Sequence, residues 1–409
     1  MNWWKSRLSA SLVAILVLAS SAVGVEIDLG LEEFVQAGGA DIQVAGYSVP
    51  SFEDWNNDLL KDLIVGEGGG SGDAKVRIYL NVGTEATPEF DEFFYAQSEG
   101  ADLACAAAGC LGCFPRVVYW DQDDRKDLLV GQSDGTVKIY LNVTDDNEPA
   151  FDAGHLITVG SDGLWNLDVG SRATPSLVDW NSDGMMDLVS GGLDGAIHIY
   201  SNCGCGGLAS PSFYFSPPDG EFAQADGRDL HVPNLRSSPA VTDLNGDGKK
   251  DLLTGNTDGL LLFYENVGTD SLPIFAGYSL VTSNGEPIDL PGMARSRPAI
   301  CTWTGDGYFG PKDGYWDVLV GAGDGKVRLY RGIPAVGDFD ADGDIDVDDL
   351  RQFVALWRQP DPPQDSPADL NGDGILDSLD LEAFVELMLA ANPAGDTLEE
   401  EQTPDDGLE

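Results

Sequence analysis

The stretch Asp243-Leu-Asn-Gly-Asp-Gly-Lys-Lys-Asp251 decides the fold, because its pattern occurs five times in the chain. A proline comes first, an oxygen-bearing side chain follows four residues later, and acidic or amide groups then occupy every second position up to a closing aspartate. The prolines are Pro50, Pro115, Pro175, Pro239 and Pro298, and the closing aspartates are Asp62, Asp127, Asp187, Asp251 and Asp317. A period of 60 to 66 residues indicates supersecondary units that bury their apolar faces against one another.

Each copy has the pattern of four short antiparallel strands. In the third copy a proline-led run begins at Pro175, an apolar strand covers 187–191, and a strand of alternating polarity covers 196–200 after the turn at Asp194-Gly195. Four strands per repeat are typical of a β-propeller. The fifth copy lacks a fourth strand, and residues 34–44 resemble the corresponding segment 280–290. We therefore predict an all-β five-bladed β-propeller over residues 25–332, closed by a strand from the N-terminus.

The acidic loops have the ligand spacing that Ca²⁺ prefers, with side-chain oxygens at positions 1, 3, 5 and 9 and a glycine at position 6. The predicted metal ligands are Asp54, Asn56, Asp58 and Asp62 in the first loop, Asp121, Asp123 and Asp127 in the second, Asp179, Asn181, Asp183 and Asp187 in the third, and Asp243, Asn245, Asp247 and Asp251 in the fourth. Leu59 strains the first loop, and Tyr119 and Asp124 leave the second one doubtful. We expect the fifth loop to be empty because an insertion separates Thr302, Thr304 and Asp306 from Asp317. The alternative is that these residues only form turns.

The loops at 179–188 and 243–252 resemble the calcium-bearing FG-GAP/VCBS repeats of integrin-α-like propellers and of secreted bacterial proteins. The resemblance covers residues 26–332 and implies a propeller used for extracellular recognition or adhesion. Five copies differ from the seven blades of integrins. Loop position 2 holds four tryptophans, which either stack on sugars or, in our preferred interpretation, pack between the blades; they are Trp55, Trp120, Trp180 and Trp303.

A second kind of acidic loop begins at Asp338 and recurs at Asp369, each followed by a helical pattern. The pair resembles a type I dockerin with two F-hand calcium loops, which implies a small α-helical domain at 336–392 and a cohesin-type protein partner. By that resemblance the ligands are Asp338, Asp340, Asp342, Asp344, Asp346 and Asp349 in the first loop, and Asp369, Asn371, Asp373, Ile375, Asp377 and Asp380 in the second. Asp344 and Ile375 would bind through their carbonyl groups. The partner-selecting positions 10 and 11 differ between the loops, being Val347-Asp348 and Ser378-Leu379. Residues 393–409 have the composition of a disordered acidic tail.

The N-terminus and the composition indicate a secreted protein. Residues 1–24 have the pattern of a secretory signal peptide, with an uncleaved membrane anchor as the alternative, and we expect no transmembrane segment in the mature chain. A net charge of −48 excludes nucleic acid as a partner. In an oxidising compartment we expect the cysteines to form disulfides rather than a metal–thiolate cluster, and the sequence does not determine how they pair. The six cysteines are Cys105, Cys110, Cys113, Cys203, Cys205 and Cys301.

These features predict a secreted, calcium-binding, non-catalytic propeller that recognises a glycan or protein ligand, with the dockerin-like module holding a partner. The three histidines, His155, His198 and His231, stand in no recognisable catalytic motif. Two alternatives stay open: a dockerin-bearing polysaccharide hydrolase or lyase, and a structural subunit of an extracellular surface assembly. The hydrolase requires a cluster of carboxylates outside the calcium loops in one pocket.

Overall fold

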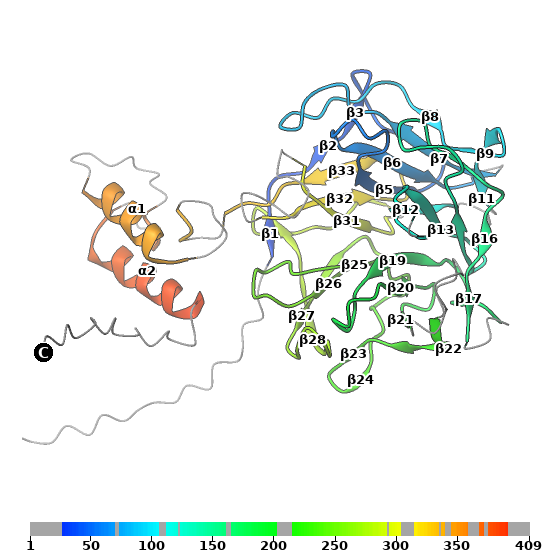
Figure 1. Cartoon of the computed structure of the whole chain (residues 1–409). Coiled ribbons are helices and arrows are strands. Elements are labelled where there is room, and N and C mark those ends of the chain that lie inside the picture. The colour runs from blue at the N-terminus through cyan, green and yellow to red at the C-terminus, as the bar shows by residue number, and fades with distance from the viewer. Residues whose placement is uncertain are drawn as a thin grey trace, which may run out of the picture.

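The computed structural model describes residues 27–69, 73–105, 112–121, 123–160, 165–202, 215–292, 294–303, 315–334, 337–339, 345–358, 368–371 and 375–391. These residues are mostly in β-strands, and two helices follow near the C-terminus (Figure 1). No helix among them is long and apolar enough to cross a membrane. The predicted signal peptide and acidic tail lie outside the described residues.

The third repeat shows how one unit is built. Its strands β19 (Thr174–Val178), β20 (Asp187–Gly191), β21 (Ile197–Asn202) and β22 (Phe215–Phe222) lie side by side in chain order, and each neighbouring pair is antiparallel. Every residue of β20 is buried, because the strand is covered on both faces, which explains its continuous apolar sequence.

The same arrangement recurs in the other repeats, each as a sheet whose strands follow the chain order. The first sheet contains β5 (Ser48–Glu53), β6 (Asp62–Glu67), β7 (Ala74–Tyr79), β8 (Phe94–Tyr95) and β11 (Ala104–Cys105). The second contains β12 (Phe114–Val118), β13 (Asp127–Gly131), β14 (Val137–Tyr140) and β16 (His155–Leu156). The fourth contains β25 (Pro239–Thr242), β26 (Asp251–Gly255), β27 (Leu261–Asn266) and β28 (Phe275–Leu280), and the fifth contains β31 (Arg297–Cys301), β32 (Asp317–Gly321) and β33 (Val327–Tyr330).

Short strands extend or connect these sheets. The third sheet gains β17 (Thr158–Val159) and β18 (Trp165–Asn166), and the fourth gains β23 (Gln224–Ala225) and β24 (Arg228–Asp229). Two small sheets consist of β9 (Gln97–Ser98), β10 (Ala101–Asp102) and β15 (Ala150–Phe151), and of β1 (Asp28–Leu29), β29 (Thr282–Ser283) and β30 (Glu286–Pro287).

The N-terminal segment supplies the strand that the fifth sheet lacks. Strand β2 (Glu33–Phe34) pairs antiparallel with β33, with Glu33 opposite Leu329. The hairpin of β3 (Gln36–Ala37) and β4 (Ala40–Asp41) then follows, as β29 and β30 follow β28 in the fourth repeat. The predicted pairing of the first segment with the last sheet is confirmed.

The first strands of the five sheets contact one another in the cyclic order β5, β12, β19, β25, β31 and back to β5. Their approach is tight because each second strand has a glycine at its last or penultimate position, and this glycine lies against the main chain of the next repeat. A Cβ atom on Gly131 would lie 2.2 Å from the Ala173 carbonyl oxygen, and one on Gly321 would lie 2.3 Å from that of Ser48. The contact between the last and first repeats therefore has the same geometry as the internal contacts.

The hydrophobic core lies between neighbouring sheets, where the four tryptophans at loop position 2 are 3–7 % exposed. Trp303 stacks on Phe52 of the first sheet with ring centroids 4.8 Å apart, and Trp120 lies 6.2 Å from Phe215. The structure thus supports packing between repeats, and the sugar-stacking alternative is wrong for these side chains.

The C-terminal helices form a separate small core. Helix α1 (Val347–Trp357) and helix α2 (Ser378–Ala391) meet through Phe353 and Phe384, whose rings stack 5.2 Å apart and are fully buried. Phe339 packs on both rings. Each helix follows one of the two predicted twelve-residue loops, so the helical prediction after each loop is confirmed.

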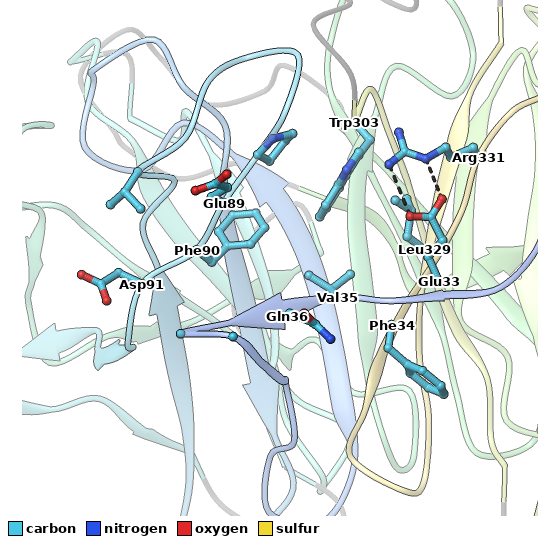
Figure 2. Close-up of a pocket in the computed structure, with 14 residues that line it drawn as sticks. Glu33, Phe34, Val35, Gln36, Glu89, Phe90, Asp91, Trp303, Leu329 and Arg331 are labelled. Atoms are coloured by element: carbon cyan, nitrogen blue, oxygen red, sulfur yellow. Dashed lines mark hydrogen bonds and ion pairs between the residues drawn. The ribbon is translucent and has the colours of Figure 1, made fainter.

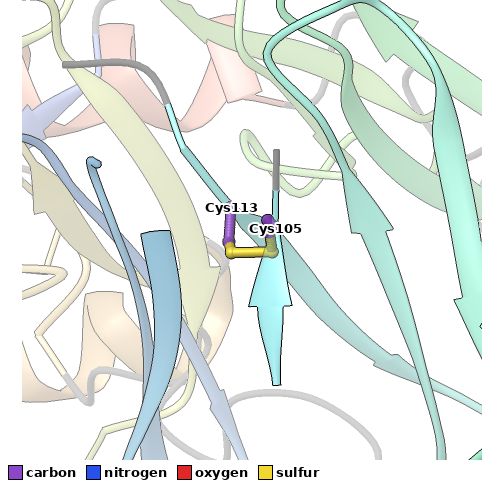
Figure 3. Close-up of a disulfide and its surroundings, with 2 residues drawn as sticks. All are labelled: Cys105 and Cys113. Atoms are coloured by element: carbon purple, nitrogen blue, oxygen red, sulfur yellow. A yellow bond between two sulfur atoms is a disulfide. The ribbon is translucent and has the colours of Figure 1, made fainter. Parts of the chain in front are cut away.

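A disulfide joins Cys105 and Cys113, whose Cα atoms are 5.7 Å apart (Figure 3). It closes the segment between β11 of the first repeat and β12 of the second. Cys301 is a buried free thiol. Cys110, Cys203 and Cys205 lie outside the described residues, so the bond accounts for one of the pairings that the sequence left open.

Candidate functional site

The fourth acidic loop brings carboxylates together as its spacing predicted. Ligand atoms of Asp243, Asp247 and Asp251 lie within 4.8 Å of one another, close enough to bind a single cation. The pKa of Asp251 is raised to about 7, chiefly by burial and in smaller part by the charges of Asp247 and Asp243. A bound divalent cation would relieve this repulsion.

Position 6 of each described loop turns the chain through the left-handed region. Gly184 and Gly248 have φ angles of 84° and 82°, as the predicted glycine role requires. Leu59 and Asp124 take the same conformation, with φ angles of 73° and 62°, although they carry a Cβ atom. The predicted strain in the first loop is therefore present, and the second loop has it too.

The closing aspartate has a role that the ligand pattern did not reveal. In the third repeat, Asp187 Oδ2 accepts a hydrogen bond of 3.0 Å from the Trp180 N–H, and its Oδ1 accepts one of 2.7 Å from the Asn202 N–H. The other four copies repeat both bonds, through Asp62, Asp127, Asp251 and Asp317. Each carboxylate thus joins the start of its loop to the end of the third strand. Asp317 recurs in a copy that lacks the other ligands, so metal binding does not explain its presence. This recurrence was the sequence signal from which the structural role could have been predicted.

The first two loops contain basic groups that compete with a metal ion. Lys126 Nζ lies 3.6 Å from Asp54 Oδ1, and both side chains are buried. Arg125 pairs with Asp123 in the second loop. The half-buried Asn56 donates a hydrogen bond of 3.0 Å to the exposed Asp58, and Asp121 accepts from the Asp123 N–H. The first loop is therefore less suited to a cation than its ligand set suggested, and the doubt about the second is justified.

The third loop matches the fourth. Asp179 accepts hydrogen bonds from the N–H groups of Asp183 and Gly184 at 3.0 Å each, and Asn181 accepts from the Asp183 N–H at 2.9 Å. Asp243 and Asn245 make the same bonds in the fourth loop. Both loops therefore have the same hydrogen bonds between side chains and main chain, whereas among the described residues only the fourth brings three carboxylates within 4.8 Å of one another. Thr304 and Asp306 of the fifth loop lie outside the described residues.

The two C-terminal loops share one local geometry at their last ligand. Asp349 accepts from the N–H groups of Phe339 and Asp346 at 2.6 and 2.8 Å, and it completes the capping box of α1. Asp380 accepts from the equivalent Asp377 N–H at 2.8 Å, and its second donor is the Asn371 N–H at 3.2 Å, one loop position later than Phe339. Both aspartates are fully buried, Asp338 is nearly so, and Asp369 and Ile375 are also described. Asp340, Asp342, Asp344 and Asp373 lie outside the described residues.

A pocket of about 530 Å³ lies where the N-terminal segment meets the first repeat (Figure 2). Three carboxylates outside the calcium pattern line it, and apolar side chains form part of its walls; the acids are Glu33, Glu89 and Asp91. Arg331 donates to both oxygens of Glu33, at 2.7 and 3.5 Å. In the view of Figure 2, Glu89 and Glu33 lie on opposite sides of Trp303, whereas Asp91 points away. No local sequence pattern predicts this pocket, because its walls come from segments almost 300 residues apart.

A family described as FG-GAP-like repeat matches residues 179–254, so this part of the chain consists of β-propeller-type repeats. No curated protein matches the chain. Similar solved structures include a GH43_1 enzyme from Xanthomonas citri, at 10% identity and a TM-score of 0.45, over 76% of this chain and 92% of that one. A GH43 β-xylosidase/α-arabinofuranosidase from a compost metagenome has 11% identity and a TM-score of 0.43, over 74% and 94%. An Agrocybe aegerita lectin specific for terminal N-acetylglucosamine has 18% identity and a TM-score of 0.34, over 70% and 63%.

The predicted non-catalytic function in recognition or adhesion needs correction. Glycoside hydrolases of the GH43 type recur among the similar structures. The pocket lined by Glu33, Glu89 and Asp91 meets the requirement set above for the hydrolase alternative. The four repeat tryptophans are also buried, so they offer no exposed aromatic surface to a glycan, and such a surface was the main support for glycan recognition. We do not retain the non-catalytic interpretation.

Proposed function

We propose that this chain is a dockerin-bearing polysaccharide hydrolase or lyase on a calcium-stabilised five-bladed propeller. The observation that carries the proposed activity is the pocket of Figure 2, where carboxylates outside the calcium loops share one cavity. Its volume of about 530 Å³ falls within the range of ligand pockets. The polysaccharide-active alternative required a cluster of carboxylates outside the calcium loops in one pocket, and this pocket contains such carboxylates.

Two of the carboxylates have surroundings that suit different roles. The bidentate contact with Arg331 fixes the orientation of Glu33, which suits a base or a nucleophile. The carboxylate of Glu89 is exposed and makes no hydrogen bond within the described part of the chain, so its oxygens are accessible to the leaving-group oxygen of a bound glycoside. A sugar ring bound between them would contact the exposed Val82 and the half-buried Pro88 at the pocket wall.

The activity is tested by the release of reducing ends, and of unsaturated products, from a panel of neutral and acidic polysaccharides. We expect Glu89→Gln and Glu33→Gln to lower kcat at least about 100-fold, as removal of a general acid or base does. The matched control is Glu92→Gln, which changes an exposed neighbour that does not line the pocket. Unchanged turnover in both pocket variants would exclude this site.

The five-bladed fold is supported by the cyclic contact of the first strands and by the β2–β33 pairing. Calcium binding is supported by the convergence of Asp243, Asp247 and Asp251. At extracellular calcium levels each filled loop would stabilise the fold by about 1 kcal/mol. Calorimetric titration should show that Asp247→Asn removes one site and that Asp289→Asn, an exposed change in the same repeat, removes none. Equal stoichiometry in both variants would refute the fourth site.

We propose secretion and a cohesin-type partner on two further observations. The disulfide between Cys105 and Cys113 fits an oxidising compartment. The matched geometry of Asp349 and Asp380 fits two calcium loops, each leading into a helix. Capture by immobilised cohesin domains should occur with calcium and disappear with a chelator. Capture that survives the chelator, or never occurs, would contradict a calcium-ordered docking module.

A further inference from the structure

Three arginines occupy one equivalent position in successive repeats, three residues before the proline that leads the first strand. They are Arg172, Arg236 and Arg295. Their N–H groups donate to equivalent carbonyls, those of Ser133, Leu193 and Thr257, at 3.1 to 3.2 Å. Because the first strands contact one another cyclically, these residues enter the ring from the same end. Arg297, at the start of β31, adds a fourth guanidinium.

All three equivalent arginines have a left-handed backbone conformation. Their φ angles are 58°, 65° and 51°, in the region that favours glycine. Such a conformation costs roughly 1 kcal/mol or more for a residue with a Cβ atom. A turn alone would be formed better by glycine, so a requirement for the arginine side chains explains the retained strain.

The deepest of these side chains has a donor with no acceptor. Arg172 is fully buried, and its Nη1 and Nη2 donate at 2.8 Å to the Ser237 carbonyl and the Ser238 hydroxyl, both neutral groups. Within the part of the chain that the structure describes, its Nε has no hydrogen-bond partner, and the buried hydroxyl of Tyr47 has none either. Buried donors are normally paired, so these two indicate a missing acceptor.

Aromatic rings hold the guanidinium groups together. Arg172 lies 5.3 Å from the centroid of Phe114, and Arg297 lies 5.8 Å from it. Arg297 and Arg295 lie 4.3 and 4.8 Å from the centroid of Tyr47. Arg172, Arg295, Arg297 and the two rings therefore form one compact group, and Arg236 belongs to it because its charge acts on Arg172. We call this set the arginine cluster: Tyr47, Phe114, Arg172, Arg236, Arg295 and Arg297.

The cluster concentrates positive charge in a protein with a net charge of −48. Burial lowers the pKa of Arg172 well below its ordinary value, and the charges of Arg297 and Arg236 lower it further. Within the described residues, no carboxylate forms an ion pair with Arg172. Buried charges without a counter-charge are strongly unfavourable, so an anion at this position would stabilise the fold.

We propose that the arginine cluster is a binding site for an oxyanion of the size of a carboxylate or sulfate, with Arg172 Nε and the Tyr47 hydroxyl as donors. The planar guanidinium donors suit an anion with two or more oxygens. The source is either a free inorganic anion or the carboxylate of an acidic sugar. This site is separate from the pocket of Figure 2 and does not depend on the proposed activity.

The test is calorimetric titration of the full chain, together with its thermal midpoint, in sulfate, phosphate and D-glucuronate. Glucose and chloride at matched ionic strength serve as reference ligands. We expect saturable binding of an oxyanion, and Arg172→Gln should weaken its Kd about tenfold or more, as loss of charge-assisted hydrogen bonds does. The control is Arg228→Gln, which removes an exposed arginine outside the cluster.

If Arg172→Gln fails to fold, Arg236→Gln changes a half-buried member of the cluster instead. Binding of sulfate or phosphate alone would identify a free inorganic anion as the source, and preferred binding of glucuronate would identify a sugar acid. No saturable binding of any oxyanion would overturn the proposal. Binding that is equally strong in the Arg172→Gln or Arg236→Gln variant would also overturn it.

Discussion

Replacement of Asp317 by asparagine tests whether the closing aspartate of each repeat is primarily a structural group. Its Oδ2 accepts from the Trp303 N–H at 2.7 Å, its Oδ1 accepts from the Gly332 N–H at 2.9 Å, and the side chain is 4 % exposed. An asparagine offers one oxygen, so its NH₂ group would face one of the two donors. The lost charge-assisted bond and the unpaired N–H together predict a loss of about 3 kcal/mol.

The assay is urea unfolding followed by tryptophan fluorescence, in excess chelator and again in calcium. A loss of this size would lower the thermal midpoint by roughly 5–10 °C. The matched control is Asp289→Asn, which changes an exposed carboxylate and should alter stability by less than about 0.5 kcal/mol. A loss that appears only in calcium would refute the reasoning, because the carboxylate would then act as a metal ligand.

Three further predictions concern other features of the fold. Leu59→Gly should stabilise the calcium-free chain by about 1 kcal/mol and tighten calcium binding, because Leu59 has a φ of 73°; a destabilised variant in chemical unfolding would contradict this. His198→Phe should stabilise the fold by about 1 kcal/mol, because among the described residues neither buried ring nitrogen has a hydrogen-bond partner, and Asp194 Oδ2 lies 3.7 Å from Nε2, beyond hydrogen-bond distance. Burial lowers the pKa of His198, so the natural chain should lose stability as the pH falls below the ordinary histidine value; in thermal melts the variant should lose less. Cys105→Ser with Cys113→Ser should cost about 2–3 kcal/mol, the loop-closure value for a separation of 8 residues, and chemical unfolding of the oxidised and double-variant chains measures it.

Much of the fold follows from local sequence patterns, for reasons the third repeat makes clear. The apolar run of β20 and the Asp194-Gly195 turn specify strands and their order, because a buried strand and a tight turn are local properties. Gly195 has the positive φ that the turn requires, at 84°. The N-terminal closure was also predictable, since 34–44 repeats the pattern of 280–290. The close approach of Gly131 or Gly321 to the next repeat depends on three-dimensional packing and could not be predicted in this way.

The candidate sites were less accessible to sequence reasoning. Ligand spacing identified Asp243, Asp247 and Asp251 because the whole set lies within nine residues. The competition between Lys126 and a cation at Asp54 arises between two repeats, so spacing within one loop cannot show it. Glu33 and Glu89 meet in one pocket only because the N-terminal strand closes the sheet.

The glycines at the ends of the second strands set how repeats can be rearranged. Gly131 lies against the Ala173 carbonyl at a junction between consecutive repeats, and Gly321 lies against the Ser48 carbonyl at the junction between the last and first repeats. The two approaches are nearly equally close, so both kinds of junction have the same shape. A gene that joined residue 332 to residue 27 through a short linker and began between two other repeats should therefore encode a circular permutant with the same architecture. Each junction is therefore an equivalent place for the polypeptide to begin. Replacing any of these glycines by alanine should push the two flanking repeats apart, because the added Cβ atom would overlap the neighbouring carbonyl.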